Sequence, residues 1–199
     1  AVGTIKSVLE LNYPKDKLEI IILNDGSTDN SEKNIFKLLP ELKNSKRQKI
    51  RIKTINNVFR VIDFIEAELK NNIRVKYVYQ INSGKGVALN VGISLAKGKF
   101  YASLDADSYV HKDTLIKMLA VYYYAQLKTT RKIGAITPTM YVFNPKSYIE
   151  KFQYYEFLMS FFVARIMSEH DMIYVTPGPF SLHDIDIVKK LGGYNEDQS

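Results

Sequence analysis

The sequence predicts an α/β fold with a mostly parallel sheet flanked by helices. The first observation is the segment EIIILN at 19–24, which is continuous in apolar, largely β-branched residues. Strands of this kind are buried on both faces and are typical of parallel sheets. The second observation is that similar short runs alternate along the chain with segments of helical periodicity. This alternation indicates strand–helix units, in which helices connect parallel strands.

Composition places the chain among ordinary globular domains. Its 199 residues are the usual size of one domain, and its 46% hydrophobic and 25% charged residues exclude a disordered chain. The absence of cysteine from the sequence excludes a disulfide framework and a thiolate metal site. The formal net charge of +7 admits a polyanionic partner: nucleic acid, an acidic membrane face or a phosphorylated small molecule.

Five elements are predicted before residue 82. A helix opens the chain, the strand at 19–24 follows, and a second helix begins at a cap formed by Asp29 or Ser31 and ends before Pro40. A third helix is predicted from apolar residues at helical spacing, namely Val58, Val61, Ile62, Ile65 and Leu69. Alternating apolar residues then predict a strand at 73–81.

The second half of the chain continues the same alternation. A helix opens at Gly84-Lys85-Gly86 and runs to Lys97, and a final helix is capped by Asp184 and closed by Gly192-Gly193. Between them the patterns predict strands at 99–104, 133–143 and 172–176, and helices from 111 and over 147–169. The long helix carries aromatic residues on more than one face. Core packing is the favoured explanation, and docking on a membrane-embedded partner is the alternative.

A cluster of basic residues lies between 41 and 53, a segment that contains six lysines and arginines and a single acid, Glu41. We favour a solvated connection, since no aromatic residues are interleaved with the charges. The alternative is a non-catalytic domain that binds a polyanion or a membrane surface through this segment. No uncharged stretch is long enough to cross a bilayer, because the longest runs over 133–145 and contains Pro138 and Pro145.

Two acidic clusters come directly after predicted strands, at Asp25 and at Asp105/Asp107. Ligands of parallel α/β sheets bind outside the carboxyl ends of the strands, so these carboxylates are candidate site residues. Asp105 and Asp107 suit a hard divalent cation held by one or two carboxylates and substrate phosphates. Asp25 could accept a hydrogen bond from a ribose or a base, and Gly26 after it would permit the close approach of such a ligand. The competing explanation for both clusters is an ordinary turn or helix cap.

Gly84-Lys85-Gly86 opens a predicted helix, and a helix N-terminus with a lysine is a natural position for a diphosphate. The segment is not a Walker loop, because the longer glycine-rich run is missing. A plain helix start with a surface lysine is the alternative. A nucleotidyltransferase would need a glycine-rich triphosphate loop, which the sequence does not show.

Taken together, these segments resemble the family 2 glycosyltransferases, which have the GT-A fold, a Rossmann-like α/β fold. The resemblance lies in EIIILNDGSTDNS at 19–31, GKGVALNVGISLAKGKFYASLDADS at 84–108 and VTPGPFSLHDIDIVKKLGGYNED at 175–197. The last segment is similar to the glycine-rich part of the membrane-embedded polysaccharide synthases, which include cellulose, hyaluronan and poly-N-acetylglucosamine synthases. The resemblance covers nearly the whole chain except about residues 40–72.

The resemblance implies a role for each motif residue. Asp25 would contact the nucleoside, and Lys85 would lie near the nucleotide. Asp105 would face the ribose or the diphosphate, and Asp107 would bind Mg²⁺ or Mn²⁺. On the acceptor side, Gly178 and Pro179 would form the loop beside the acceptor.

The implied reaction is an inverting, metal-dependent transfer from a nucleotide sugar, expected to be a UDP-sugar, to a saccharide or lipid-linked acceptor. We expect one domain over 1–199, with a donor-binding half at 1–110 and an acceptor-side half at 111–199. The resemblance also places a first strand before residue 1 and the catalytic base after Ser199, so a domain truncated at both ends is expected. It places transmembrane segments outside the chain, the full-length protein on the cytoplasmic face of the cell membrane, and no nucleic acid among its partners.

Overall fold

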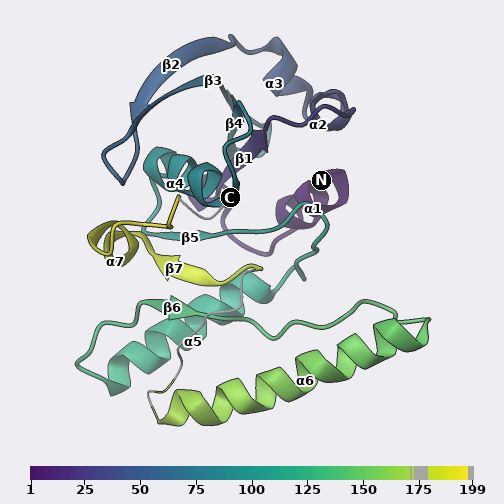
Figure 1. Cartoon of the computed structure of the whole chain (residues 1–199), viewed down its shortest axis with the longest axis vertical. Coiled ribbons are helices and arrows are strands. Elements are labelled where there is room, and N and C mark those ends of the chain that lie inside the picture. The colour runs from purple at the N-terminus through teal and green to yellow at the C-terminus, as the bar shows by residue number, and fades with distance from the viewer. Residues whose placement is uncertain (171, 173–178, 197–199) are drawn as a thin grey trace.

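The computed structural model describes residues 1–170, 172 and 179–196, and its described strands form two sheets (Figure 1). The larger sheet has the order β1-β4-β3-β2, with bounds Glu19–Asp25 for β1, Arg74–Gln80 for β4, Phe59–Glu68 for β3 and Gln48–Lys53 for β2. The smaller has the order β5-β7-β6, with bounds Phe100–Ala102, Leu182–Asp184 and Ala135–Ile136. Helices flank both sheets, as Figure 1 shows, so the predicted α/β class is confirmed.

The strand pairing is mixed rather than mostly parallel. Within the described ranges β1 and β4 are the parallel pair, and the other four pairings are antiparallel. The helix predicted from Val58 to Leu69 is wrong, because this segment is the strand β3. Its apolar spacing fits a helix, but it is rich in β-branched residues and lies between two asparagine turns. Asn57 and Asn72 adopt left-handed backbone there, at φ 63° and 65°, which asparagine tolerates.

The basic segment at 41–53 is not a loose connection. It forms the short helix α3 (Pro40–Asn44) and the edge strand β2, so Pro40 begins a helix rather than only ending one. Ile50 and Ile52 pack against the core, while Lys49, Arg51 and Lys53 alternate with them on the exposed face. Charged side chains on an edge strand protect it from pairing with other chains, which gives this basic cluster a structural explanation.

Most of the predicted helices are confirmed. They are α1 (Val2–Leu9), α2 (Ser31–Leu38), α4 (Lys85–Leu95), α5 (Thr114–Lys128) and α7 (Ile185–Lys190), and a short 3₁₀ turn, η1 (Lys15–Lys17), precedes β1. Asp29 accepts a hydrogen bond from the Ser31 amide at the start of α2. Asp184 caps α7 by accepting from the amides of Asp186 and Ile187. Asp184 is therefore the cap that the sequence predicts, whereas the N-cap of α2 is Asn30, without a side-chain cap, and Asp29 only braces the turn before it.

The strand β4 carries two consecutive buried side chains with polar groups, Lys76 and Tyr77, on opposite faces of the larger sheet. The Tyr77 hydroxyl accepts from Asn24 Nδ2 at 2.7 Å and donates to Glu32 Oε2 at 2.8 Å, and burial raises the pKa of this phenol. Lys76 lies on the other face of β4, where its ammonium is 2.7 Å from Glu19 Oε1 and donates to the Leu95 carbonyl at 2.6 Å. Both groups are satisfied within the fold, as buried polar groups must be.

The long helix α6 (Tyr148–Glu169) corrects the expectation of core packing, because none of its 22 residues is buried. A capping box formed by Ser147 and Glu150 fixes its start. The strand predicted over 133–143 is reduced to the two residues of β6, and the strand expected at 172–176 lies outside the described residues apart from Met172. Among the described helices, none has the length and hydropathy needed to cross a membrane.

Candidate functional site

The ends of β1 and β5 meet near the start of α4. At the beginning of the two strands, the Lys97 amide donates to Glu19 Oε2 at 2.9 Å. At their far ends, the Gly84 amide contacts Asp25, and the next residue, Lys85, reaches Asp105. Three of the segments singled out in the sequence are therefore gathered at one edge, on the carboxyl ends of the strands, as expected for an α/β ligand site.

The Lys85 ammonium lies 2.7 Å from Asp105 Oδ1, and the two side chains are 68% and 40% exposed. An ion pair this open to solvent contributes little to folding stability, typically about 0–1 kcal/mol. The lysine can therefore exchange its carboxylate for another anion at small cost. Its position at the first residue of α4, where no side chain caps the helix, adds free amide donors and the positive end of the helix dipole.

Asp25 is held by three hydrogen bonds from the chain itself. Its Oδ1 accepts from Gln80 Nε2 at 2.7 Å and from the Ser83 amide at 2.9 Å, and its Oδ2 accepts from the Gly84 amide at 3.0 Å. The carboxylate thus shapes the loop between β4 and α4 that carries Lys85. Its expected contact with a nucleoside stays a prediction, and would use the acceptor capacity that these three bonds leave.

Gly26 is needed where β1 ends. Its φ is +74°, and a Cβ there would lie 2.7 Å from the Asn82 amide nitrogen. Any other residue would push the β4–α4 loop away from Asp25. Glycine at this position therefore lets two strand ends approach closely.

Two side chains of α1 and one hydrogen bond within the loop itself hold the Asp105–Asp107 loop in place. The Ser108 amide donates to the Asp105 carbonyl at 3.1 Å, closing the turn. Thr4 Oγ1 donates to the Ala106 carbonyl at 2.7 Å, and Ser7 Oγ accepts from the Val110 amide at 3.2 Å. These two hydroxyls were not identified from the sequence, where they are simply small polar residues on an amphipathic helix.

The two carboxylates suit a divalent cation in their chemistry. Asp107 is exposed, and the Ser108 hydroxyl donates to its Oδ1 over a long 3.4 Å. Mg²⁺ is commonly held by one or two carboxylates together with substrate phosphates, so this pair fits Mg²⁺ or Mn²⁺. In the part of the chain that is described, no group of three or more acidic or histidine side chains could hold a metal alone.

The segment 193–196 is tied down onto α4 by a buried amide. Asn90 is fully buried, and its Nδ2 donates to the Tyr194 carbonyl and to Glu196 Oε1, both at 2.9 Å. Its Oδ1 accepts from the Tyr194 amide at 2.9 Å. Gly86, one turn earlier on the same helix face, has no room for a Cβ because the Asn195 carbonyl occupies that position. The glycine of the lysine motif therefore serves this packing.

Arg60 on β3 completes the attachment. Its Nη2 is 2.6 Å from Glu196 Oε2. Burial alone would raise the pKa of the Glu196 carboxyl, but the hydrogen bonds from Asn90 and Arg60 and the charge of Arg60 outweigh it and lower that pKa. The carboxylate is therefore a structural anchor that stays ionised, in agreement with leaving it out of the predicted catalytic residues.

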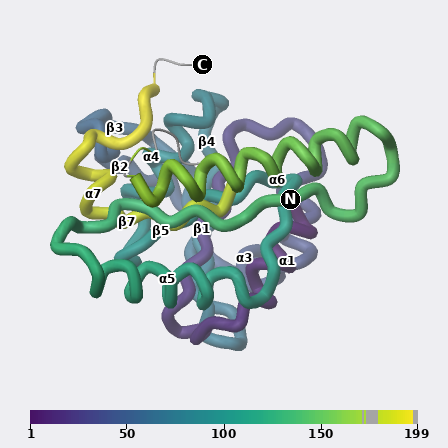
Figure 2. Tube along the Cα trace, turned by 90° about the horizontal axis from the view of Figure 1, so that it is seen from below, coloured from purple at the N-terminus to yellow at the C-terminus, as the bar shows by residue number. Residues whose placement is uncertain are grey.

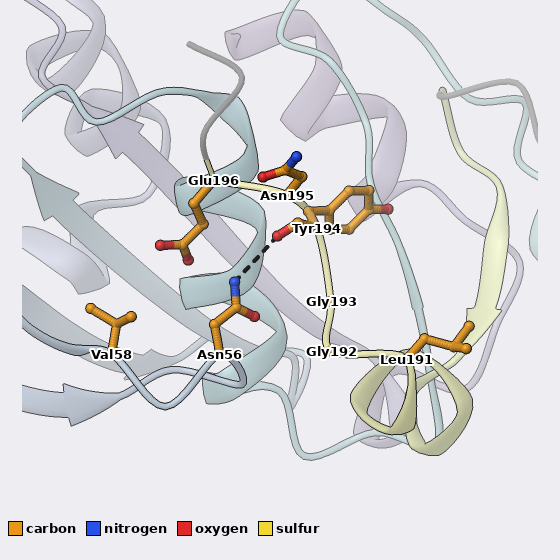
Figure 3. A pocket seen from close by; sticks show the side chains of 8 residues that line it. All are labelled: Asn56, Val58, Leu191, Gly192, Gly193, Tyr194, Asn195 and Glu196. Atoms are coloured by element: carbon orange, nitrogen blue, oxygen red, sulfur yellow. Dashed lines mark hydrogen bonds between the residues drawn. The ribbon is translucent and has the colours of Figure 1, made fainter.

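An open pocket of about 450 Å³ lies beside this segment (Figure 3). It is lined by Asn56, Val58, Leu191, Gly192, Gly193, Tyr194, Asn195 and Glu196. Figure 3 shows the Glu196 side chain pointing toward the turn that carries Asn56 and Val58, with Asn56 bonded to the Tyr194 carbonyl. The residues predicted from the sequence do not line it, so it is an adjacent hollow and not the strand-end site.

The smaller sheet brings three aromatic rings together. The Tyr101 and Tyr194 hydroxyls are 2.8 Å apart, and the Tyr101 ring stacks on His183 with centroids 5.1 Å apart. Burial raises the pKa of Tyr101, and burial also lowers the pKa of His183. Both groups are therefore neutral near neutral pH, and they connect β5, β7 and the 193–196 segment.

Only part of the predicted acceptor-side loop lies within the described residues. Gly178 lies outside the described residues, whereas Pro179 is half-buried. The next residue, Phe180, is buried with a left-handed φ of 57°, and its amide donates to the Ser103 carbonyl at 2.6 Å. The described end of this loop therefore lies against the strand that leads into Asp105, which puts it beside the candidate donor site. Such backbone in a bulky residue is unusual and is concentrated at functional sites.

A solved structure with a similar fold is Staphylococcus aureus TarS, residues 1–349, crystallised in complex with UDP. The match has a TM-score of 0.53 and 17% sequence identity, and it covers 98% of this chain and 46% of that chain. At this identity the match supports the fold, which is the GT-A fold that the sequence resemblance implied.

Curated relatives include poly-β-1,6-N-acetyl-D-glucosamine synthases of two species. That of Staphylococcus epidermidis is 29% identical over 98% of this chain and 38% of its own length. That of Staphylococcus aureus strain COL is 34% identical over 77% of this chain and 28% of its own length. The chain thus spans less than two-fifths of the length of the relatives it matches.

The family model described as glycosyl transferase family 2 matches residues 2–63 and 60–191. These two ranges include Asp25, Lys85, Asp105 and Asp107, the motif residues of the strand-end site. They also include 40–72, which the sequence resemblance left out. The chain belongs to glycosyl transferase family 2.

Proposed function

We propose that this chain is the donor-binding part of an inverting glycosyltransferase that moves a sugar from a UDP-sugar to a saccharide or lipid-linked acceptor. One observation carries the proposal: in a family 2 domain, Lys85 and Asp105 meet at 2.7 Å where the ends of β1 and β5 converge. A cation, a helix N-terminus and two exposed carboxylates at one edge can bind a diphosphate together with a metal ion.

The donor would lie across the strand ends, with its diphosphate at the start of α4. Lys85 would leave Asp105 and contact a phosphate oxygen, because the exposed ion pair is weak. Asp25 would hold the β4–α4 loop in place and offer its remaining acceptor capacity to the nucleoside. Thr4 and Ser7 would keep the Asp105–Asp107 loop from moving when the donor binds.

Asp107, with Asp105, would hold Mg²⁺ or Mn²⁺. A bound divalent ion would act as a Lewis acid and stabilise negative charge on the diphosphate. Lys85, at the same edge, adds a positive charge that favours the diphosphate as it leaves. The arrangement concentrates positive charge where the leaving group becomes more negative.

In the proposed reaction an acceptor hydroxyl oxygen forms a bond to the anomeric carbon, and the bond from that carbon to the diphosphate oxygen breaks. The electron pair of the broken bond stays on the nucleoside diphosphate, and the hydroxyl proton passes to a general base. Attack opposite the leaving group inverts the anomeric configuration. We assign that base to no residue of the described ranges, in line with the expectation that it follows Ser199.

The relatives' names suggest which sugar to test first. They are synthases of a poly-N-acetylglucosamine chain, so UDP-N-acetylglucosamine is the proposed donor and an N-acetylglucosamine chain the proposed acceptor. Similarity to membrane-embedded synthases further supports a full-length protein that acts at the cytoplasmic face of the cell membrane.

Isothermal titration of the folded chain with UDP and with ADP, in the presence of Mn²⁺, tests the donor site. We expect UDP to bind and Lys85→Ala to weaken it by about tenfold, the loss of one charge-assisted contact. The matched control is Lys70→Ala, another exposed lysine, in the turn between β3 and β4. Equal binding of UDP and ADP, or no effect of Lys85→Ala, would contradict the proposal.

A further inference from the structure

We propose that the outward face of α6 docks on an anionic lipid bilayer, with the helix lying parallel to the membrane surface. This surface lies at one end of the molecule, apart from the strand ends that carry Lys85 and Asp105 (Figure 1). The inference therefore stands on its own observations and does not depend on the proposed donor chemistry.

The helix α6 is apolar on two opposite sides. One side is half-buried against the protein and carries Tyr154, Phe157, Leu158, Phe161 and Ala164. The other side, here called the outward stripe, consists of Tyr148, Phe152, Tyr155, Met159, Phe162 and Ile166. A helix in water normally has one apolar side and one polar side, so the second apolar side calls for a second apolar surrounding.

The outward stripe is unusually exposed for its composition. Its six side chains are between 58% and 91% exposed, at intervals of four and three residues that keep them on one side over the length of the helix. A helix of 22 residues is about 33 Å long, so the stripe is continuous over roughly that distance. Contiguous apolar surface of this extent marks an interaction site rather than ordinary exposed residues.

The exposed apolar surface continues beyond α6. Seen from below, Figure 2 shows α6, the loop that precedes it and α5 together forming this end of the molecule. Tyr141 and Phe143 in the loop are exposed, and so are several apolar residues of α5. Two exposed tyrosines lie beside lysines: the Lys128 ammonium is 4.3 Å from the Tyr124 ring centroid, and Lys151 is 5.9 Å from that of Tyr148.

Charge and residue type select a lipid surface as the occupant. Residues 114–169, which form this end of the molecule, contain seven lysines and arginines against three acids, a net charge of +4 that complements anionic lipid headgroups. Five of the basic residues lie in α5 and the loop before α6, which therefore supply the positive charge beside the outward stripe. Tyrosine and lysine are the residues that prefer the boundary between headgroups and acyl chains, while phenylalanine, methionine and isoleucine can enter it. The helix α6 itself carries two basic and three acidic side chains, so its own contribution to binding is the apolar outward stripe and the attraction to anionic headgroups comes from its neighbours.

Flotation of the folded chain with vesicles tests the proposal, using phosphatidylcholine alone and phosphatidylcholine mixed with phosphatidylglycerol. We expect binding to the mixed vesicles and little binding to phosphatidylcholine alone. The variant Phe152→Ser/Phe162→Ser should lower the bound fraction on mixed vesicles by about tenfold or more, because two large apolar contacts are removed. Both positions are exposed, so the fold should remain intact, as circular dichroism would check.

The matched control is Val61→Ser, which removes an exposed apolar side chain on β3 at the opposite end of the molecule. It should leave vesicle binding unchanged. Sedimentation velocity without lipid separates the competing occupant, a second copy of the chain. Self-association that Phe152→Ser/Phe162→Ser abolishes, without vesicle binding by the wild type, would overturn the proposal. UDP titration of the same variant should match the wild type, which separates a failure here from a failure of the donor site.

Discussion

The Lys85 ammonium and the Asp105 carboxylate lie 2.7 Å apart across 20 residues of sequence. Lys85 begins α4 and Asp105 follows β5, so the contact joins the two ends of the helix–strand unit α4–β5. Its exposure makes it exchangeable, and its position at the strand ends makes it the place where an anionic ligand would enter. The donor site proposed for this family 2 domain centres on this pair.

If Lys85 exchanges Asp105 for a phosphate of the donor, a substitution at Asp105 should change the affinity for UDP. Asp105→Asn removes the charge that competes with a phosphate for Lys85 but keeps the shape of the side chain. We expect UDP measured without divalent metal to bind more tightly to this variant, by up to about tenfold. With Mn²⁺ present, the gain should disappear, since a carboxylate near the metal is lost as well. Titration calorimetry under both conditions measures this, and a variant that weakens metal-free binding would contradict the exchange.

The anchored carboxylate of Glu196 predicts a pH dependence of stability. Its folded pKa is lowered, so the stability it contributes is fully present above the pKa of about 4.3 of an unfolded glutamate. That stability is lost as the pH falls through the lower, folded value. Glu196→Gln should therefore destabilise the protein by about 1–2 kcal/mol at neutral pH and by little near pH 3. Urea unfolding of both proteins across this range would show converging stabilities, and parallel curves would refute the anchor.

The contact between Gly86 and Asn195 predicts an asymmetric response to alanine. Gly86→Ala forces a Cβ onto the Asn195 carbonyl and should cost about 1–3 kcal/mol. Gly134→Ala is the control, because its Cβ would lie 3.7 Å from the Ile187 side chain, an ordinary contact, and should change stability by about 0.5 kcal/mol or less. Denaturant unfolding compares the two. Equal effects would show that the 193–196 segment does not pack on α4 as described.

The buried ion pair of Lys76 and Glu19 predicts strong coupling between two residues on neighbouring strands. Lys76→Met leaves the Glu19 carboxylate enclosed without its charge partner and should destabilise the fold by about 3–5 kcal/mol. Combining it with Glu19→Leu should recover most of that loss, because the remaining group is then apolar. A double-mutant cycle by thermal unfolding measures the coupling. Simple additivity of the two changes would argue against the pair.

Much of the fold follows from local patterns. The apolar run of β1, the capping residue Asp184 and the glycine-bounded α4 each indicate their element from a few neighbouring residues. The sequence pattern predicts a helix where β3 lies because a short apolar segment can fit both the helical and the strand period, and its strand identity depends on pairing with β2 and β4. The expected burial of α6 failed for a similar reason, since apolar composition does not specify what covers a helix.

The motif residues of the candidate site are predictable from the sequence, whereas the residues that hold the site in place are not. Asp25, Lys85 and Asp105 each follow or begin a predicted element, so their convergence at the strand ends could be anticipated. Asn90 gave one signal, a lone amide in an apolar helix. Arg60 and Thr4 gave none, because their roles arise from contacts with residues more than a hundred positions away.

The measurement that tests the central claim most directly is the Mn²⁺ dependence of UDP binding, by titration calorimetry, in wild type and in Asp107→Ala. Asp16→Ala, an exposed aspartate in the turn before β1, is the matched control. We expect Mn²⁺ to tighten UDP binding about tenfold or more in wild type and in Asp16→Ala, and to have no effect in Asp107→Ala. UDP binding that ignores Mn²⁺ in all three folded proteins, or a metal effect that survives in Asp107→Ala, would contradict the proposed metal-assisted donor site.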